Sequence, residues 1–338
     1  MALVKHDLLV IGAAILWGTV GAAGRTLYAV AGAHPITIAF SRLLFSVPVL
    51  WLLASLGGGR RRFLRLNGEN WGIAAIAASA VALYQLLYFN AVAGAGVMAA
   101  TVLSLCSAPV FAGLLARVFL REPLPWRWWV ALGLSVAGTI LIVGSGGPSP
   151  GPLTPGPSMP GPSAGGPPVS GPPVSTLPSG PAAGWSGYFM ALGAGLCYAT
   201  YTVAGKEVVR ENDPFRALAA IFTLAALLFL PLASRSSFRW LLDPGAFLLA
   251  LYIGGIGTGV AYALFTTGLR RIPVRVATLY TLLEPLTASL LAVLFLSEQL
   301  SAQKILGAII LLAGLLILAT GGNAGGRLAA RQGEGSQA

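Results

Sequence analysis

Long apolar stretches separated by short polar segments dominate this chain. Ten of them are about 20 residues long, the length that an α-helix needs to cross the hydrocarbon core of a bilayer. None shows the strict polar–apolar alternation that is typical of a membrane β-barrel strand. The pattern therefore predicts an all-α polytopic membrane protein. The expected spans are Leu8–Tyr28, Ile36–Ser55, Trp71–Ala93, Val97–Leu120, Arg127–Val143, Trp185–Gly205, Phe215–Ala233, Ala246–Leu269, Val274–Leu296 and Ala302–Thr320.

One segment interrupts this pattern, from Gly146 to Gly184. Thirteen of its residues are proline and ten are glycine, and it carries no charge. Proline excludes a regular helix or central strand, and the Gly and Ser between the prolines loosen the rest. We expect a linker at 146–184 between two halves, 1–145 and 185–320. The Gly-rich polar tail at 321–338 is predicted to be disordered.

The composition supports a membrane protein. Hydrophobic residues make up 56% of the chain and charged residues only 9%, and the mean hydropathy is +0.80. A soluble domain carries about 25% charged residues. The net charge of +11 could suggest nucleic acid, but the basic residues gather in short clusters between apolar stretches. This distribution is typical of membrane topology and argues against a nucleic-acid partner.

The positions of Lys and Arg predict the orientation. With the N-terminus in the cytoplasm, fifteen of them fall on the cytoplasmic side, and only Arg25, Arg235, Arg239 and Lys304 fall on the other. This bias follows the positive-inside rule. We expect a multi-pass protein of the cytoplasmic membrane with both termini cytoplasmic and the linker outside. The apolar stretch near the start leads into no cleavage site, so no cleavable signal peptide is expected.

The two halves repeat each other. At the start of each half, Trp17-Gly18-Thr19 corresponds to Tyr198-Ala199-Thr200. Each half has five spans, an odd number, so the second copy is predicted to lie inverted in the membrane. Toward the ends of the halves the offset between the copies is constant, and it pairs Pro109 with Pro285, Glu122 with Glu298 and Gly138 with Gly314.

Four motifs carry a resemblance to a known family. They are Leu16-Trp17-Gly18, the segment from Pro35 to Arg42, Leu283-Glu284-Pro285-Leu286, and Phe295-Leu296-Ser297-Glu298-Gln299-Leu300. With the duplication, they make the chain similar to the EamA-type members of the drug/metabolite transporter superfamily. The resemblance implies a permease that exports small metabolites. The chain departs from the family in its long linker and in Ala108, where the second half has Glu284.

Two charged residues, Glu284 and Arg42, lie well inside their predicted spans rather than near the ends, and a charge there costs about 2.5–3.5 kcal/mol. Glu284 lies near the middle of its span and shares a helical stripe with Tyr280 and Thr287. It could bind a proton or a substrate amine, or it could be a structural carboxyl that serves backbone groups freed by Pro285. Arg42 could hold a substrate carboxylate or a partner on another helix, or its side chain could extend to the outer surface.

A second group of candidate site residues is uncharged. The amide of Gln85, at mid-span, needs partners for both of its groups. Tyrosines at helical spacing give their spans polar faces, which suit either a solute cavity or hydrogen bonds between helices. The uncharged candidates are Trp17, Tyr84, Gln85, Tyr88, Tyr198, Tyr201, Tyr262 and Tyr280.

We therefore expect a secondary active transporter that exports amino-acid-like or amphipathic solutes by alternating access, with proton coupling left open. A passive facilitator of the same fold is the first alternative, and an intramembrane enzyme or scaffold is the second. His6 and His34 are the only histidines, and Cys106 and Cys197 lie in apolar stretches. We therefore predict no catalytic site, metal or cofactor. The oligomeric state stays undetermined.

Overall fold

The computed structural model describes residues 2–31, 33–56, 70–95, 97–144, 185–296 and 301–334. Over these ranges the chain is helical, and no β-strand occurs in them. The linker at 146–184 lies outside the described residues. The elements are α1 (Ala2–Ala31), α2 (Pro35–Leu56), α3 (Asn70–Ala95), α4 (Val97–Phe119), α5 (Trp126–Gly144), α6 (Trp185–Glu211), α7 (Pro214–Ala233), the short helix η2 (Arg239–Leu242), α8 (Pro244–Leu251), the π-helical η3 (Tyr252–Val260), α9 (Ala261–Leu269), α10 (Val274–Tyr280), α11 (Leu283–Leu296) and α12 (Ala302–Glu334).

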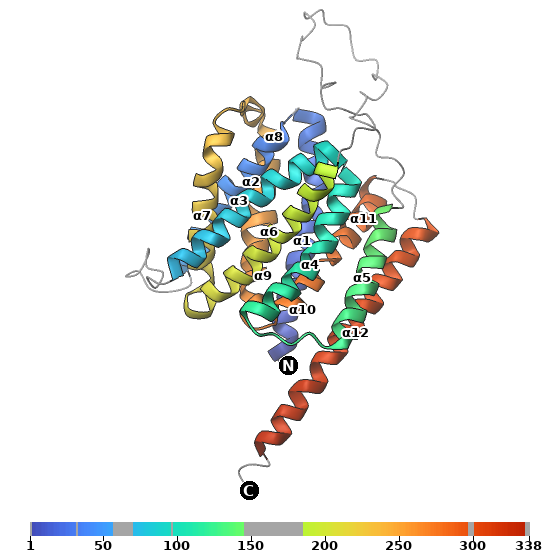
Figure 1. The fold of residues 1–338 in the computed structure, drawn as a ribbon. Coiled ribbons are helices and arrows are strands. Elements are labelled where there is room, and N and C mark those ends of the chain that lie inside the picture. Colours follow the sequence, from blue (N-terminus) through green and yellow to red (C-terminus); the bar gives the residue numbers. More distant parts are fainter. Residues whose placement is uncertain are drawn as a thin grey trace, which may run out of the picture.

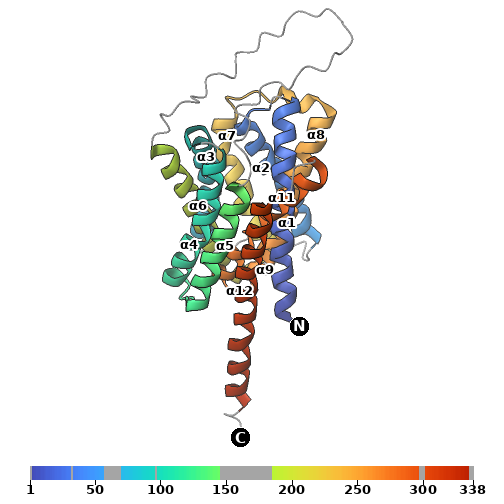
Figure 2. The same ribbon diagram turned by 90° about the vertical axis from the view of Figure 1, so that its right-hand side faces the viewer.

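The chain is a polytopic helical membrane protein. Within the described ranges, seven helical stretches are long and apolar enough to cross a membrane: α2, α3, α4, α5, α7, the continuous stretch from α8 to α9, and α12. The predicted spans outside this set are α1, α6 and the pair α10–α11. The helices form one bundle, and the N-terminal end of α1 lies at the same end of the molecule as the C-terminal end of α12 (Figures 1 and 2).

The packing joins the two halves of the chain throughout. α3 packs against α6 and α7, and α4 packs against α6. α1 packs against α9 and α11, and α2 packs against α7 and η3. α5 and α12 lie side by side at one edge of the bundle (Figure 1). The middle of the bundle is therefore lined by helices from both halves.

Local sequence signals explain where several helices begin and end. Asp213 and Asp243 cap α7 and α8, because their carboxylates accept from the backbone N–H of Arg216 and Ala246 at 3.1 and 2.8 Å. A proline follows each cap, where its missing N–H is harmless. α4 ends differently. Arg121 has a φ of 55°, and the next backbone N–H returns to the carbonyl of Ala116 at 3.1 Å.

The predicted single span Val274–Leu296 is wrong in one respect, because the structure breaks it into α10 and α11. Thr281 and Leu282 form the turn between them, and the N–H groups of Leu282 and Glu284 bond to carbonyls three residues back. Pro285 is the physical reason, since its ring clashes with the carbonyl four residues earlier, that of Thr281. Tyr280 and Glu284 therefore do not lie on one continuous helix, and the helical stripe predicted to join them is absent.

The tail also differs from its expectation. α12 continues as a helix through Glu334, whereas the sequence predicted disorder from Gly321 onward. Arg327 to Gln332 consists of Arg, Leu, Ala and Gln, which are all strong helix formers. These residues extend the helix that the apolar part of α12 has already started.

Candidate functional site

A cluster of aromatic rings occupies the middle of the bundle. Trp17 of α1 packs on Tyr262 of α9 with ring centroids 4.9 Å apart, and Tyr262 packs on Phe222 of α7 at 4.9 Å. Tyr201 of α6 joins them at 5.6 Å from Tyr262. Tyr198 lies 6.4 Å from both Trp17 and Tyr84 of α3. Helices that are far apart in the sequence therefore meet through their aromatic side chains.

A small cavity lies beside these rings. Its volume is about 10 Å³, which is room for about one water molecule. A solute of metabolite size does not fit in this conformation, so the helices must separate to admit one. The cavity is lined by Arg42, Leu43, Ala80, Val81, Tyr84, Gln85, Tyr198, Tyr201, Phe222, Thr258 and Tyr262.

The side chain of Arg42 points into the bundle rather than to the outer surface. Its Nε donates to the hydroxyl of Thr258 at 3.4 Å, and no other hydrogen bond or ion pair joins the guanidinium to a described residue. Thr258 lies in η3, where its hydroxyl donates to the carbonyl of Ile253 at 2.9 Å. This five-residue spacing is that of a π-helix, a form often found at functional sites. The π-helix thus holds the acceptor for Arg42.

Close packing of α2 against η3 brings Arg42 to this acceptor. A Cβ on Gly254 would lie 2.6 Å from Cβ of Phe45 and 3.0 Å from the carbonyl of Ser41. One on Gly259 would lie 3.2 Å from Val49. Only glycine permits the backbones to approach so closely. The glycines of η3 therefore position the cation.

Glu284 lies in the first turn of α11, next to the ring cluster. A Cβ on Gly18 of α1 would lie 2.9 Å from the backbone oxygen of Glu284, so α1 and α11 touch at this point. The carboxylate makes no hydrogen bond or ion pair with a described residue. Its charge acts on Arg42, Tyr84, Tyr198 and Tyr262. The anion and the cation thus share one region without bonding to each other.

The structure brings together most of the site residues expected from the sequence. Arg42, Tyr84, Gln85, Tyr198, Tyr201 and Tyr262 line the cavity, while Trp17 and Glu284 adjoin it. Two others lie elsewhere. The hydroxyl of Tyr88 is 2.9 Å from that of Thr101, outside the cavity lining. Tyr280 is hydrogen-bonded to Asp7 of α1.

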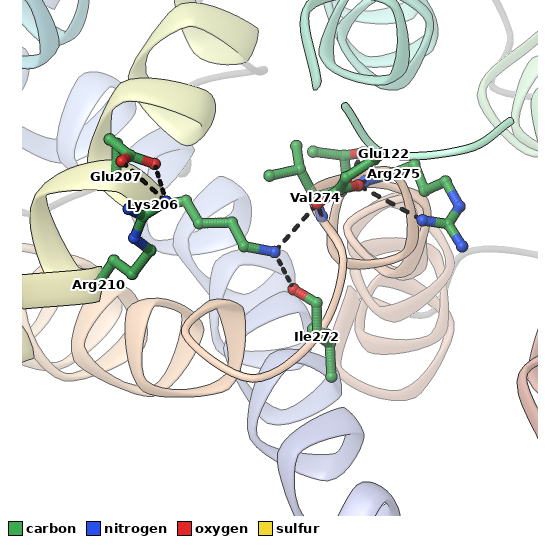
Figure 3. A network of polar contacts seen from close by, with 8 residues as sticks. Glu122, Lys206, Glu207, Arg210, Ile272, Val274 and Arg275 are labelled. Carbon is green, nitrogen blue, oxygen red and sulfur yellow. Dashed lines mark hydrogen bonds and ion pairs between the residues drawn. The ribbon is translucent and has the colours of Figure 1, made fainter. Parts of the chain in front are cut away.

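A charged network joins the end of α4 to α6 and α10 at one end of the bundle (Figures 1 and 3). Glu122 follows the left-handed residue that ends α4, and its carboxylate accepts from Lys206 Nζ of α6 at 3.0 Å. The same carboxylate accepts from the backbone N–H of Val274 at 2.9 Å and lies 3.5 Å from a guanidinium nitrogen of Arg275. Lys206 also donates to the carbonyl of Ile272 at 2.6 Å. Glu122 therefore caps α10 from another part of the chain.

Sequence reasoning missed this network and the role of Thr258. The sequence did contain a signal for the network, because Glu122 and Glu298 occupy equivalent positions in the two halves. Nothing in the sequence identified Thr258, because its hydroxyl reaches the carbonyl five residues earlier only where the chain forms a π-helix. Among the described residues, no three His, Cys, Asp or Glu side chains are grouped so that they could hold a metal.

The fold and the family evidence together define a membrane transporter. The model of the EamA-like transporter family matches residues 4–144 and 185–320. The chain therefore belongs to the EamA-like transporter family, within the drug/metabolite transporter superfamily.

Known relatives and a solved structure agree with this assignment. The uncharacterized transporter YwfM of Bacillus subtilis is 32% identical over 93% of both chains. The threonine/homoserine exporter RhtA of Escherichia coli K12 is 34% identical over 132 residues, which are 37% of this chain and 43% of that one. One solved crystal structure has a TM-score of 0.69 at 18% identity and covers 93% of this chain and 96% of its own, a likeness of fold alone.

Proposed function

We propose that this protein is a secondary active transporter that exports small, amino-acid-like solutes through the central cavity. The observation that carries the proposal is the pair Arg42 and Glu284. Both charges face the middle of the bundle, and neither forms an ion pair with a described residue. A charge inside a membrane protein is costly unless it has a function or a partner. An α-amino acid would supply a carboxylate for Arg42 and an ammonium for Glu284.

The ten spans are proposed to form two inverted five-helix repeats, 1–145 and 185–320. In this arrangement α6 corresponds to α1, α3 to α9 and α4 to α11. The contact of α3 with α6 then corresponds to that of α9 with α1, and the contact of α4 with α6 corresponds to that of α11 with α1. The contact between α5 and α12 maps onto itself. A Cβ on Gly138 would lie 2.5 Å from the carbonyl of Gly307, and one on Gly314 would lie 2.8 Å from that of Ala131. The constant offset between the halves exchanges these two contacts.

Such repeats place the substrate site between the halves and open it to one side at a time. The cavity has room for about one water, and the network of Glu122 joins the end of α4 to α6 and α10 at one end of the bundle. We propose that this end is cytoplasmic, because the basic clusters of the sequence, including Lys206 and Arg275, gather there. Both termini would then be cytoplasmic. Reporter fusions after Leu66 and after Asn323 should read cytoplasmic, and one near Met159 external.

Export is suggested by RhtA, whose name states threonine and homoserine export. The test compares the amino acids in the medium of cells that lack the gene, cells that overexpress it, and cells that overexpress Arg42→Gln. We expect at least one amino acid to accumulate with the parent protein and not with the variant. Equal amino-acid concentrations in the media of all three strains, with normal membrane levels of the protein, would contradict the proposal.

A passive facilitator of the same fold, in which Glu284 is structural, is the second candidate. It is favoured by the close packing of α1 on the first turn of α11, where a Cβ on Gly18 would lie 2.9 Å from the backbone oxygen of Glu284. Proteoliposomes distinguish the two. A proton-coupled transporter concentrates the exported amino acid when a pH gradient is imposed, whereas a facilitator only equilibrates it.

A further inference from the structure

Two buried polar atoms in the ring cluster have no hydrogen-bond partner within the described part of the chain. They are the indole Nε1 of Trp17 and the hydroxyl of Tyr198. The side chain of Trp17 is only 6% exposed. A buried N–H or O–H without a partner costs free energy, and proteins rarely retain one without a reason.

Both atoms belong to the same small region. The rings of Trp17 and Tyr198 meet edge to face with centroids 6.4 Å apart. Tyr198 lines the cavity, and Trp17 packs on Tyr262, which also lines it. The neighbouring tyrosine hydroxyl of Tyr88 is different, because it lies 2.9 Å from the hydroxyl of Thr101 and has its partner within the protein.

The two residues are equivalent in the repeated sequence. Trp17-Gly18-Thr19 of α1 corresponds to Tyr198-Ala199-Thr200 of α6. Each half therefore contributes one hydrogen-bond donor from the same point of its first helix. Arg42 adds further donors beside them, since only its Nε is bonded to a described residue.

We propose that Trp17 and Tyr198 form a donor pair, one member from each half, that recognises a hydrogen-bond acceptor of the solute, a carboxylate or carbonyl oxygen. The inference rests on the proposed function, because it assigns these side chains to the transported solute. Indole N–H is a donor only, so this part of the site selects for an acceptor. A solute without such an oxygen leaves both donors unpaired and is rejected.

The first test needs no solute. Tyr198→Phe and Tyr88→Phe each delete one hydroxyl oxygen, and the melting temperatures of the full-length variants are compared in detergent. We expect Tyr198→Phe to leave the melting temperature unchanged or to raise it, because the deleted group has no protein partner. Tyr88→Phe should lower it. A decrease with Tyr198→Phe as large as that with Tyr88→Phe would mean that the hydroxyl serves the fold, and would overturn the proposal.

The second test measures counterflow in proteoliposomes with an equimolar mixture of the twenty amino acids, followed by the single amino acid that is transported. Tyr198→Phe and Trp17→Phe should each raise its half-saturation concentration about tenfold, and Tyr88→Phe should not. In the double variant, the loss of binding free energy should be smaller than the sum of the losses in the two single variants, because both donors bind one acceptor.

Competition identifies the group that is recognised. The amino alcohol that corresponds to the transported amino acid lacks the carboxylate, and it should compete with the parent protein far less well than the amino acid. Equal competition would overturn the proposal, as would unchanged half-saturation in both single variants. If no amino acid is transported, the proposed function fails, and the melting temperatures still decide whether the hydroxyl of Tyr198 is reserved for a ligand.

Discussion

α4 and the pair α10–α11 have a proline at the same point of their sequences and yet fold differently. Pro109 lies inside α4, which is unbroken from Val97 to Phe119. Pro285, its equivalent in the second half, lies in the first turn of α11, directly after the break at Thr281 and Leu282. Proline by itself therefore does not decide whether a span is continuous.

The residue four positions before each proline differs between the two segments. Before α11 it is Thr281, in the turn, whose hydroxyl donates to the carbonyl of Thr278 at 2.7 Å. In α4 it is Leu105, which has no hydroxyl. Ser41 and Ser46 make the same bond to the carbonyl three residues back inside the unbroken α2, so this bond alone does not break a helix.

The break has a chemical consequence. It places Glu284 in the first turn of α11, where the positive end of the helix dipole favours a negative charge. The unbroken α4 has Ala108 at this position. Discontinuous helices commonly supply ion and substrate sites in transporters. The comparison explains why the second half supplies the acidic member of the pair, Glu284, while Arg42 of α2 in the first half supplies the cation.

The largest effect is expected for Glu284→Gln, which removes the charge and keeps the shape. If this carboxylate carries a proton, transport driven by a pH gradient in proteoliposomes should fall to the rate of protein-free liposomes. Solute binding should weaken as well, because the ammonium of the solute loses its anionic partner. The matched control is Ala108→Ser in α4, which should transport like the parent. Normal gradient-driven transport by Glu284→Gln would show that this carboxylate does not carry the coupled proton, and would assign it to structure.

The second prediction concerns the start of α10. This helix has only seven residues and no side-chain cap of its own, so the carboxylate of Glu122 is its cap. Breaking a buried ion pair by removing one partner costs about 3 kcal/mol. We therefore expect Glu122→Gln to lower the melting temperature in detergent strongly.

Glu207→Gln is the control for Glu122→Gln. Within the described part of the chain, Glu207 pairs with Arg210, three residues later in α6, whose side chain is largely exposed. Such pairs contribute about 0.3–0.5 kcal/mol. Similar melting temperatures for the two variants would show that the Glu122 network does not hold this end of the bundle together.

Much of this architecture could be predicted from the sequence, and its limits have physical causes. Hydrophobic length located the helices, and the rarity of charges within spans identified Arg42 and Glu284. The break before Glu284 is a local change of two residues, Thr281 and Leu282, which a hydropathy pattern averages over. The partner of Glu122 is 152 residues distant along the chain at Val274, so no local pattern could pair them.

The third prediction tests the contact that holds α11 against α1. A Cβ on Gly18 would lie 2.6 Å from Cβ of Thr287, and neither backbone can yield without moving a helix. Gly18→Ala should destabilise the protein by about 1–3 kcal/mol through overpacking. Gly24→Ala is the control in the same helix, because its Cβ would meet nothing within 4 Å. Equal melting temperatures for the two variants would contradict the close contact.

The smallest effect is expected at the other end of α10, where Tyr280 is hydrogen-bonded to Asp7. Asp7 precedes the first span, and burial raises the pKa of its carboxyl from the ordinary value of 3.8, while the Tyr280 bond and the charge of His6 offset part of the rise. A carboxyl with a raised pKa binds its proton more readily in the folded state, so the free energy of unfolding falls as pH rises through that range. Asp7→Asn should therefore reduce the loss of melting temperature as the pH rises above 3.8, the ordinary pKa of this carboxyl. Tyr280→Phe removes the bond that lowers the pKa and should increase that loss. If both variants follow the pH profile of the parent, the contact between α1 and α10 does not depend on this carboxyl.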